Sequence, residues 1–283
     1  MRLPCKGGNV IIEETCRMVD YFLSEGFNYF DTAHRYLGGQ SETALRECLT
    51  SRYPRDRYIL TDKLTHGIFT LTQQGVLDFF EKQLEACGVE YFDFYLMHAQ
   101  NSVYFEDFKN CRAYETAFEL KKEGRIRHVG ISFHDKAAVL DRILSEYPEI
   151  ELVQIQLNYM DWEDPSIQSR LCYEVCGKHG KPVAVMEPVK GGSLVNLPKE
   201  AGQILKSLGG GSNASYALRF AAGLPCVTMT LSGMSTMEQM RENLSVMSDP
   251  KPLSEAEIKA AERTDSRTFL EKCCATSQRK TPG

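Results

Sequence analysis

Four side chains that could hold or move a proton stand in the first hundred residues of the chain. They are Asp31, Tyr36, Lys63 and His98. A lysine ammonium beside a tyrosine oxygen favours the phenolate, so it lowers the tyrosine pKa from its ordinary value of about 10. An aspartate would hold the lysine charged, and a histidine N–H could bind the same substrate oxygen. Such a set could donate a proton to a carbonyl oxygen that receives hydride, which a cofactor must supply.

Taken singly, each of these residues also fits a structural role. Asp31 could begin a turn, Lys63 could be a solvated lysine, and Tyr36 could be a packing residue. His98 follows the apolar run FDFYLM and could be a hydrogen-bonded core histidine. Because Asp31, Lys63 and His98 stand at three successive predicted strand ends, with Tyr36 in the loop after the first, we favour the catalytic interpretation.

The pattern of apolar residues predicts alternating strands and helices. The predicted strands are residues 27–31, 58–63, 92–98, 126–132, 152–159, 182–188 and 226–232. The predicted helices are residues 13–26, 42–53, 74–88, 114–124, 136–147, 166–180, 212–223 and 235–247. Such alternation is typical of a parallel sheet. Neighbouring parallel strands lie about 4.8 Å apart and their carboxyl ends face one mouth, so side chains at successive strand ends can meet.

This many units in one domain favours an α/β fold of the (β/α)8 TIM barrel type over an open doubly wound sheet. No G-x-G-x-x-G motif follows a strand, which also argues against the doubly wound alternative. A full barrel needs an eighth strand before the helix at 13–26, where only MRLPCKGGNV stands. We therefore expect a barrel without its first strand, and the family resemblance described below implies that its N-terminal hairpin is missing as well. Residues 1–263 would form this single domain, and residues 264–283 a poorly ordered tail.

Composition excludes several classes of function. The 283 residues carry a net charge of −5, which does not favour binding to nucleic acid or to an anionic membrane. No apolar run reaches the roughly 18 residues of a membrane span, and the N-terminus lacks the apolar core of a signal peptide. We expect a cytoplasmic protein whose ten cysteines are reduced. Cys172 and Cys176 share a helix face, but no second ligand pair accompanies them, so a zinc site is not favoured.

The motifs that carry the four residues resemble those of the aldo-keto reductase family. They are FDTAHRY with the downstream SE, then TDK, LMH and GISFH, and the similarity runs from residue 8 to about residue 250. VMEPVKGGSL and LSGMSTMEQMRENL are similar to a bacterial or archaeal branch whose members often carry a C-terminal iron–sulfur domain. The tail has Cys273 and Cys274 but lacks the cysteine spacing that a [4Fe–4S] cluster needs, so no cluster is expected.

The resemblance implies a role for each of the four side chains Asp31, Tyr36, Lys63 and His98, which we call the tetrad. Tyr36 would be the general acid, Asp31 and Lys63 would tune it, and His98 would orient the substrate carbonyl. The histidine at this position favours C=O over C=C reduction. The substrate would be a small aldehyde or ketone. Residues 99–108 and the segment around Trp162 are apolar enough to line the mouth that holds it, and Trp162 could equally be a packing residue.

The resemblance also implies a nicotinamide cofactor site. Its residues would be Ser132, Gln154, Met186, Pro188, Gly233, Met234, Ser235, Gln239 and Asn243. Phe133 stands where the family usually has an asparagine that contacts the nicotinamide amide. Gly233 and Gln239 stand where many relatives place a lysine and an arginine for the 2′-phosphate, and Arg241 is nearby. NADPH is the favoured cofactor, and NADH is the alternative.

Two further functions fit the same residues. The chain could be a regulatory protein that binds a dinucleotide on this barrel with little or no turnover. It could also be an inactive truncated barrel, since fold alone does not determine function.

Overall fold

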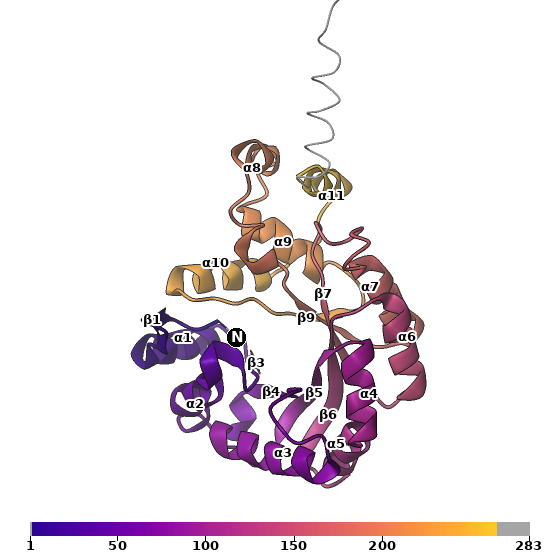
Figure 1. Ribbon diagram of the computed structural model, residues 1–283. Helices are drawn as coiled ribbons and strands as arrows, with labels where there is room; N and C mark the ends of the chain where they lie inside the picture. Colours follow the sequence, from indigo (N-terminus) through magenta and orange to yellow (C-terminus); the bar gives the residue numbers. More distant parts are fainter. Residues whose placement is uncertain (1, 265–283) are drawn as a thin grey trace, which may run out of the picture.

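A computed structural model describes residues 2–264 and contains one curled, seven-stranded parallel sheet (Figure 1). The strands lie in sequence order: β3 (Tyr29–Asp31), β4 (Ile59–Leu64), β5 (Phe92–Gln100), β6 (Ile126–Phe133), β7 (Leu152–Gln156), β8 (Val183–Met186) and β9 (Val227–Thr230). Each overlaps one of the seven predicted strands, so these predictions are confirmed. Among the described residues, β3 and β9 each pair on one side only, and the barrel is open between them.

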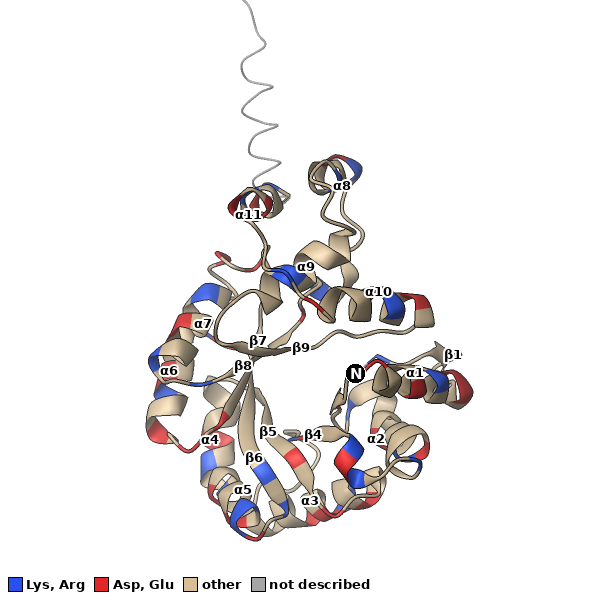
Figure 2. Cartoon of the chain, turned by 180° about the vertical axis from the view of Figure 1, so that it is seen from behind, with Lys and Arg blue, Asp and Glu red and all other residues tan. Residues whose placement is uncertain are grey.

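Helices follow the strands and cover the outside of the sheet. Those that coincide with predicted helices are α1 (Ile12–Ser24), α2 (Ser41–Leu45) with the π-helical turn η2 (Arg46–Thr50), α3 (Gln73–Cys87), α5 (Ala113–Lys122), α6 (Ala137–Glu146), α7 (Ser169–Lys178), α9 (Asn213–Ala222) and α10 (Met237–Met247). Figure 2 shows positive and negative residues interspersed on the outer helices α6, α7, α10 and α11. No helix within residues 2–264 is both long enough and apolar enough to cross a lipid bilayer.

Three α-helices were not predicted. They are α4 (Ser102–Asn110), α8 (Lys199–Lys206) and α11 (Glu255–Glu262); short 3-10 turns occur at η1 (Tyr36–Gly39), η3 (Arg55–Arg57) and η4 (Lys190–Gly192). Helix α4 occupies most of the segment that was expected to line the mouth as a loop. It begins at Asn101, whose side-chain oxygen accepts hydrogen bonds from the backbone of Val103 (3.0 Å) and Tyr104 (2.9 Å), and it buries Phe105 and Phe108.

The residues before α1 form a small hairpin that does not join the sheet. Strands β1 (Cys5–Lys6) and β2 (Asn9–Val10) pair antiparallel, where the sequence predicted no strand. Gly7 and Gly8 make the turn with φ of 59° and 83°, a backbone conformation that suits glycine. The Gln40 side chain accepts from the backbone N–H of Val10 (3.0 Å) and donates to the carbonyl of Gly8 (2.9 Å). This amide therefore fastens the hairpin to the loop after β3.

Helices α1 and α10 contact each other on the side of the barrel where β3 and β9 do not pair. Met18 of α1 packs with Met240 and Leu244 of α10 in a buried cluster, and Phe22 and Phe27 lie against it. Burial of apolar surface stabilises by about 25 cal/mol per Å². The helical layer is thus continuous across the side on which the sheet is open.

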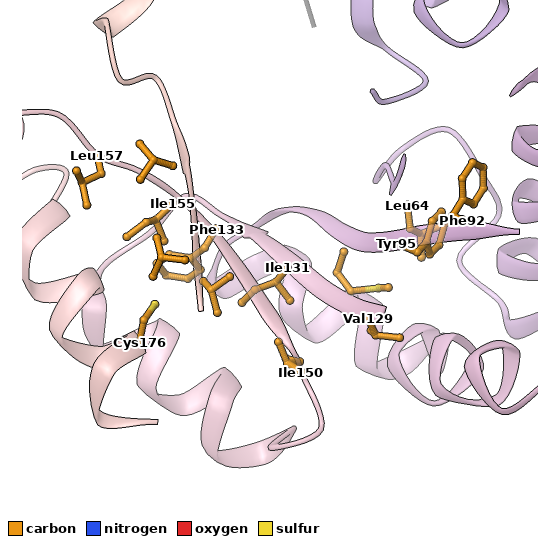
Figure 3. Packing of buried hydrophobic residues seen from close by; sticks show 14 of the residues in the cluster. Leu64, Phe92, Tyr95, Val129, Ile131, Phe133, Ile150, Ile155, Leu157 and Cys176 are labelled. Carbon is orange, nitrogen blue, oxygen red and sulfur yellow. The ribbon is translucent and has the colours of Figure 1, made fainter. Parts of the chain in front are cut away.

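Side chains alternate between the two faces of each strand, as the pleat requires. Along β6, Val129, Ile131 and Phe133 are buried in the main hydrophobic core (Figure 3). Ile155 of β7 and Cys176 of α7 belong to the same core (Figure 3). The intervening residues of the strands therefore face the barrel interior.

The interior is packed by a second, smaller apolar cluster. It consists of Leu96, Leu152 and Ala184, with Phe94 and Met229 against them. Two residues further along β5, β6 and β7, the same face carries His98, Ser132 and Gln154. The apolar layer thus lies beneath a polar one at the carboxyl ends of the strands.

Gly130 is required by the close packing of the apolar layer. It pairs with Leu96 on one side and Leu152 on the other. A Cβ at this position would lie 2.6 Å from both the Leu152 carbonyl oxygen and a Leu96 methyl carbon. No side chain fits there unless the backbone of β7 moves.

A pair of buried carboxyl groups lies on the outer face of β4, directly behind the polar layer. Asp62 and Glu42 are 0% and 1% exposed. Asp62 accepts from the backbone N–H of Lys63 (2.8 Å), and Glu42 accepts from Gln83 (3.1 Å) and contacts His34 Nδ1 (2.9 Å). Burial, the neighbouring charge of Glu42 and a hydrogen bond with it raise the pKa of Asp62 well above its ordinary value.

We expect Gly130→Ala to lower the free energy of unfolding by about 2–3 kcal/mol, the usual scale of overpacking a core. Urea denaturation measures this change. Gly177→Ala in α7 is the matched control, because its nearest neighbour to a new Cβ is the Cys226 sulfur at 4.0 Å. That variant should be neutral or slightly stabilised. Equal stability of the two variants would contradict the packing argument.

We expect Asp62→Asn to remove part of the pH dependence of stability. A raised pKa means that the native chain holds a proton that the unfolded chain releases above about pH 4, so wild-type stability falls as pH rises from there. The variant should therefore gain stability relative to wild type between pH 4 and pH 7, measured by urea unfolding at several pH values. Asp56→Asn, at an exposed position, is the control. A difference between wild type and Asp62→Asn that does not vary with pH would contradict this account.

Candidate active site

The polar layer is organised around one buried ion pair. Lys63, at 0% exposure, donates from Nζ to Asp31 Oδ1 (2.7 Å) and to the carbonyl of Thr32 (2.8 Å). Burial favours the neutral amine, but Asp31 and Tyr36, through electrostatic interaction and hydrogen bonding, outweigh it and raise the pKa of Lys63 above its ordinary value. Lys63 is therefore an ammonium group. Asp31 is its counter-ion, which is the pairing that the sequence predicted.

The loop after β3 brings Tyr36 over this ammonium. Leu37, Gly38 and Gly39 have φ of 54°, 67° and 91°, so the chain turns sharply back into α2, and two of these left-handed positions are glycine. Lys63 Nζ lies 4.8 Å from the centre of the Tyr36 ring. Tyr36 thus lies on the lysine, as predicted.

The pKa of Tyr36 departs from the prediction in its net direction. Burial is the largest effect and raises it, whereas the charge and hydrogen bonding of Lys63 lower it; the net pKa lies above the ordinary value. Lys63 therefore acts in the predicted direction but only offsets part of the desolvation. In the free protein, Tyr36 is a protonated phenol, which is the form that a proton donor needs.

His98 faces Tyr36 from the end of β5. The two rings meet edge to face, with centroids 5.9 Å apart. The register of β5 and β6 shifts between Met97 and Gln100, and Ala99 has φ of 55°, so a bulge follows the histidine. Burial and the positive charge of Lys63 lower the pKa of His98 to about 3, which keeps its imidazole neutral. Its Nδ1 lies 2.7 Å from the hydroxyl oxygen of Thr65, a contact that sequence reasoning missed.

The two residues predicted to hold the nicotinamide amide lie side by side in the interior. Ser132 and Gln154 are in register on β6 and β7 and are 1% and 2% exposed. Gln154 also donates to Asp31 Oδ2 (3.0 Å), which links the predicted cofactor site to the ion pair across 123 residues of sequence. Phe133 points to the outer core, so the side chain at this position is a packing residue (Figure 3).

The predicted residues Met186 and Pro188 stand at the end of β8, on either side of Glu187. Glu187 has φ of 56°, and its carbonyl accepts from the Asn158 side chain (3.1 Å). Asn158 also donates to Asp161 Oδ2 (2.7 Å), and Lys190 Nζ forms an ion pair with the other oxygen of that buried carboxylate. Sequence analysis did not identify Asp161 or Lys190, which stabilise the loops after β7 and β8.

The predicted residues after β9 surround the start of α10. Thr236 caps the helix by accepting from the Gln239 backbone (3.2 Å), and the Gln239 side chain accepts from Ser235 (2.9 Å). Asn243 donates to the Ser232 hydroxyl (2.9 Å), and the Met234 side chain packs in the cluster between α1 and α10. The side chains of Gln239, Asn243 and Met234 thus make contacts within this region of the chain. A phosphate at the start of α10 would therefore be bound by backbone N–H groups.

An arginine that the sequence analysis did not consider lies beside this helix start. A Cβ on Gly233 would be 2.9 Å from Cγ of Arg2, so the arginine stem rests on the glycine. A guanidinium nitrogen of Arg2 lies 3.6 Å from the corresponding position on Gly191, in the loop after β8. Arg241, in contrast, lies over the Tyr21 ring of α1 at 5.6 Å. The Arg2 stem thus packs on the turn before α10, and its guanidinium lies beside the loop after β8.

Of the two roles open to Trp162, the structure favours packing. Trp162 packs against Tyr173 and Phe220, with ring centroids 5.8 and 5.5 Å away, so it contacts the helices α7 and α9. From α4, Tyr104 stacks on His66 at 4.0 Å, and Asp107 contacts His66 Nε2 at 2.8 Å. These residues lie on the loop after β4 and on α4, beside the tetrad.

The described cysteines provide no metal site. All eight within residues 2–264 are free thiols, and Cys172 and Cys176 are buried on α7. Burial raises the pKa of both thiols, so neither is a thiolate at neutral pH. Within the same residues no three His, Cys, Asp or Glu side chains cluster as metal ligands would. Cys273 and Cys274, and the predicted tail at 264–283 beyond its first residue, lie outside the described residues.

Several solved structures with the same fold are described as aldo-keto reductases. The holo form of AKR11C1 from Bacillus halodurans superposes with a TM-score of 0.75 at 21% identity, over 94% of this chain and 91% of that one. An aldo-keto reductase from Klebsiella pneumoniae, solved with NADPH, superposes with a TM-score of 0.73 at 18% identity, over 93% and 90% of the two chains. At these identities the likeness establishes the fold.

Sequence comparison leads to the same family. The protein described as uncharacterized oxidoreductase YqkF from Bacillus subtilis is 25% identical over 274 residues, which span 86% of this chain and 85% of that protein. The model of the Aldo/keto reductase family matches residues 1–265, which include every described residue. The chain belongs to the aldo/keto reductase family.

Proposed function

We propose that this NAD(P)H-dependent oxidoreductase reduces aldehyde or ketone carbonyls to alcohols, with Tyr36 as the proton donor. The observation that carries the proposal is the contact of the buried Lys63 ammonium with Asp31 on one side and Tyr36 on the other, opposite a neutral His98. A bound nicotinamide would supply the hydride, and these four side chains would act on the oxygen that gains negative charge.

Each side chain has a distinct role in this scheme. Tyr36 donates its phenolic proton to the carbonyl oxygen, and the Lys63 ammonium stabilises the phenolate that remains. Asp31 keeps Lys63 charged and in position. A neutral imidazole has one N–H donor, so His98 can hold the carbonyl oxygen toward Tyr36 without adding a second charge. A histidine here favours C=O over C=C substrates, by similarity to the family.

The residues in the interior and at the start of α10 would hold the cofactor. Ser132 and Gln154 would bind the nicotinamide amide, Met186 and Pro188 would pack near the ring, and the turn from Gly233 to Ser235 would bind phosphate. We propose NADPH rather than NADH, because the Arg2 stem packs on Gly233 and its guanidinium lies beside the loop after β8, so this residue brings a cation to the region where the sequence seemed to lack one. The Klebsiella pneumoniae neighbour was solved with NADPH.

One observation favours a second candidate function. Within residues 2–264, β3 and β9 each pair on one side only, and the tetrad begins at β3. A site on an incompletely paired strand could bind a dinucleotide and turn over little. In that case the protein would be a regulatory binder of NADPH or NADH.

We expect Tyr36→Phe to lower kcat about 10²-fold or more while the NADPH dissociation constant changes little, because the phenolic proton acts in the chemical step. Turnover of several aldehydes is followed by nicotinamide absorbance, and binding by nicotinamide fluorescence. Tyr53→Phe is the matched control, since its hydroxyl contacts Asp20 (2.5 Å) away from the tetrad. If wild-type protein binds NADPH but reduces no aldehyde or ketone of the panel, the regulatory function is correct instead.

We expect Arg2→Ala to weaken NADPH binding about 10-fold and NADH binding much less, because only NADPH carries the 2′-phosphate that a guanidinium would bind strongly. Fluorescence titration with each cofactor gives the two dissociation constants. Arg241→Ala is the control and should leave both unchanged, since that arginine lies over Tyr21. Equal weakening of both cofactors would show that Arg2 does not select NADPH.

A further inference from the structure

Thr65 lies between the ion pair and the histidine. It directly follows β4, two residues after Lys63, and is 6% exposed. Its hydroxyl oxygen lies 2.7 Å from Nδ1 of His98. The only other hydrogen-bond partner of this hydroxyl among the described residues is the carbonyl oxygen of Lys63, at 3.5 Å.

These two distances decide which nitrogen of His98 carries the proton. A neutral imidazole has one N–H donor and one acceptor nitrogen, whereas a hydroxyl can donate or accept. If Nδ1 carried the proton and donated to Thr65, the hydroxyl hydrogen would be left with a carbonyl 3.5 Å away, at the limit of a hydrogen bond. If Thr65 donates to Nδ1, the short contact is satisfied and the imidazole proton resides on Nε2.

The position of that proton matters for the proposed reaction. With hydrogen on Nε2, the nitrogen that does not face Thr65 is a donor and can bind a carbonyl oxygen. In the other tautomer, the same nitrogen presents a lone pair to that oxygen and repels it. A charged imidazolium, which would donate from both nitrogens, is disfavoured beside the Lys63 ammonium.

We propose that Thr65 is a positioning residue, whose hydroxyl donates to Nδ1 of His98 and thereby holds the imidazole proton on Nε2 for the substrate carbonyl. The inference rests on the proposed function of His98 but concerns a property of the free protein. It assigns a role to a side chain whose hydrogen bonds, among the described residues, reach neither the charged groups of the ion pair nor Tyr36.

The test is the tautomer of His98, measured by long-range ¹H–¹⁵N correlation NMR on protein labelled with [¹⁵N]histidine at neutral pH. The chain has six histidines, and the spectrum of His98→Gln identifies the signals of His98. Wild type should show a protonated Nε2 and an unprotonated Nδ1. Thr65→Val should lose this preference, and Thr65→Ser, which keeps the hydroxyl, should restore it. A protonated Nδ1 in wild type, or an unchanged tautomer in Thr65→Val, would overturn the proposal.

Kinetics give the second readout. We expect Thr65→Val to lower kcat on the order of 10-fold, with Thr65→Ser within about threefold of wild type, since orienting a histidine is part of acid–base catalysis. Thr116→Val is the control: it removes another buried threonine hydroxyl, 2.7 Å from the Arg112 carbonyl, and should change neither kcat nor the His98 signals. If Thr65→Val does not fold, Thr65→Ala removes the same hydroxyl without adding a methyl group.

The outcomes separate this inference from the proposed function. If wild type has the predicted tautomer and Thr65→Val loses it, but no carbonyl is reduced by wild type, then the role of Thr65 stands and the proposed reaction is wrong. If wild type reduces carbonyls and the tautomer does not respond to Thr65, the reaction stands and the role of Thr65 is wrong.

Discussion

The buried ion pair between Lys63 and Asp31 is the interaction on which the rest of the site depends. An ammonium at 0% exposure is strongly destabilising unless a counter-ion and further acceptors surround it, and Asp31 and the Thr32 carbonyl supply these. Breaking such a pair costs about 3–5 kcal/mol, since it leaves one charge buried alone. The pair therefore fixes the loop after β3 relative to β4, and Tyr36 can lie over the lysine only because that loop is held. Gln154 extends the same network to β7 through the second oxygen of Asp31.

The two faces of β4 carry buried ionisable groups in different surroundings. On the inner face, opposite charges meet, and Lys63 stays protonated. On the outer face, Asp62 is fully buried beside another carboxyl group, Glu42, and burial together with the charge of Glu42 raises the pKa of Asp62 well above its ordinary value. Both arrangements restrain one short strand, together with the apolar layer in which Gly130 lets β5 and β7 approach β6. Tyr36 and His98, the donors that we propose act on the substrate, lie on the side of the inner face, so we expect the chemistry there and rigidity behind it.

Much of this could be predicted from the sequence, because periodicity is local. Apolar runs identified all seven strands of the sheet, and the rule that parallel strands end at one mouth brought Asp31, Lys63 and His98 together. The sequence pattern does not reveal helix α4, because Tyr104, Phe105 and Phe108 also fit a loop that lines the mouth. The contacts of Gln154 with Asp31 and of Arg2 with Gly233 join distant segments, and no local pattern encodes them. The net pKa of Tyr36 was also beyond prediction, since the sequence names the neighbouring lysine but not the extent of burial that outweighs it.

The central claim is that the Lys63 ammonium offsets the cost of ionising the buried Tyr36. The most direct test is a pH titration of Tyr36 by NMR on protein labelled with [¹³Cζ]tyrosine, assigned by the signal that disappears in Tyr36→Phe. The account predicts that the titration midpoint of Tyr36 is higher in Lys63→Met than in wild type, because the neighbouring positive charge is lost while the burial and the charge of Asp31 remain. An equal or lower midpoint in Lys63→Met would contradict it, and the tetrad would then be four neighbours without the electrostatic coupling that the reaction requires.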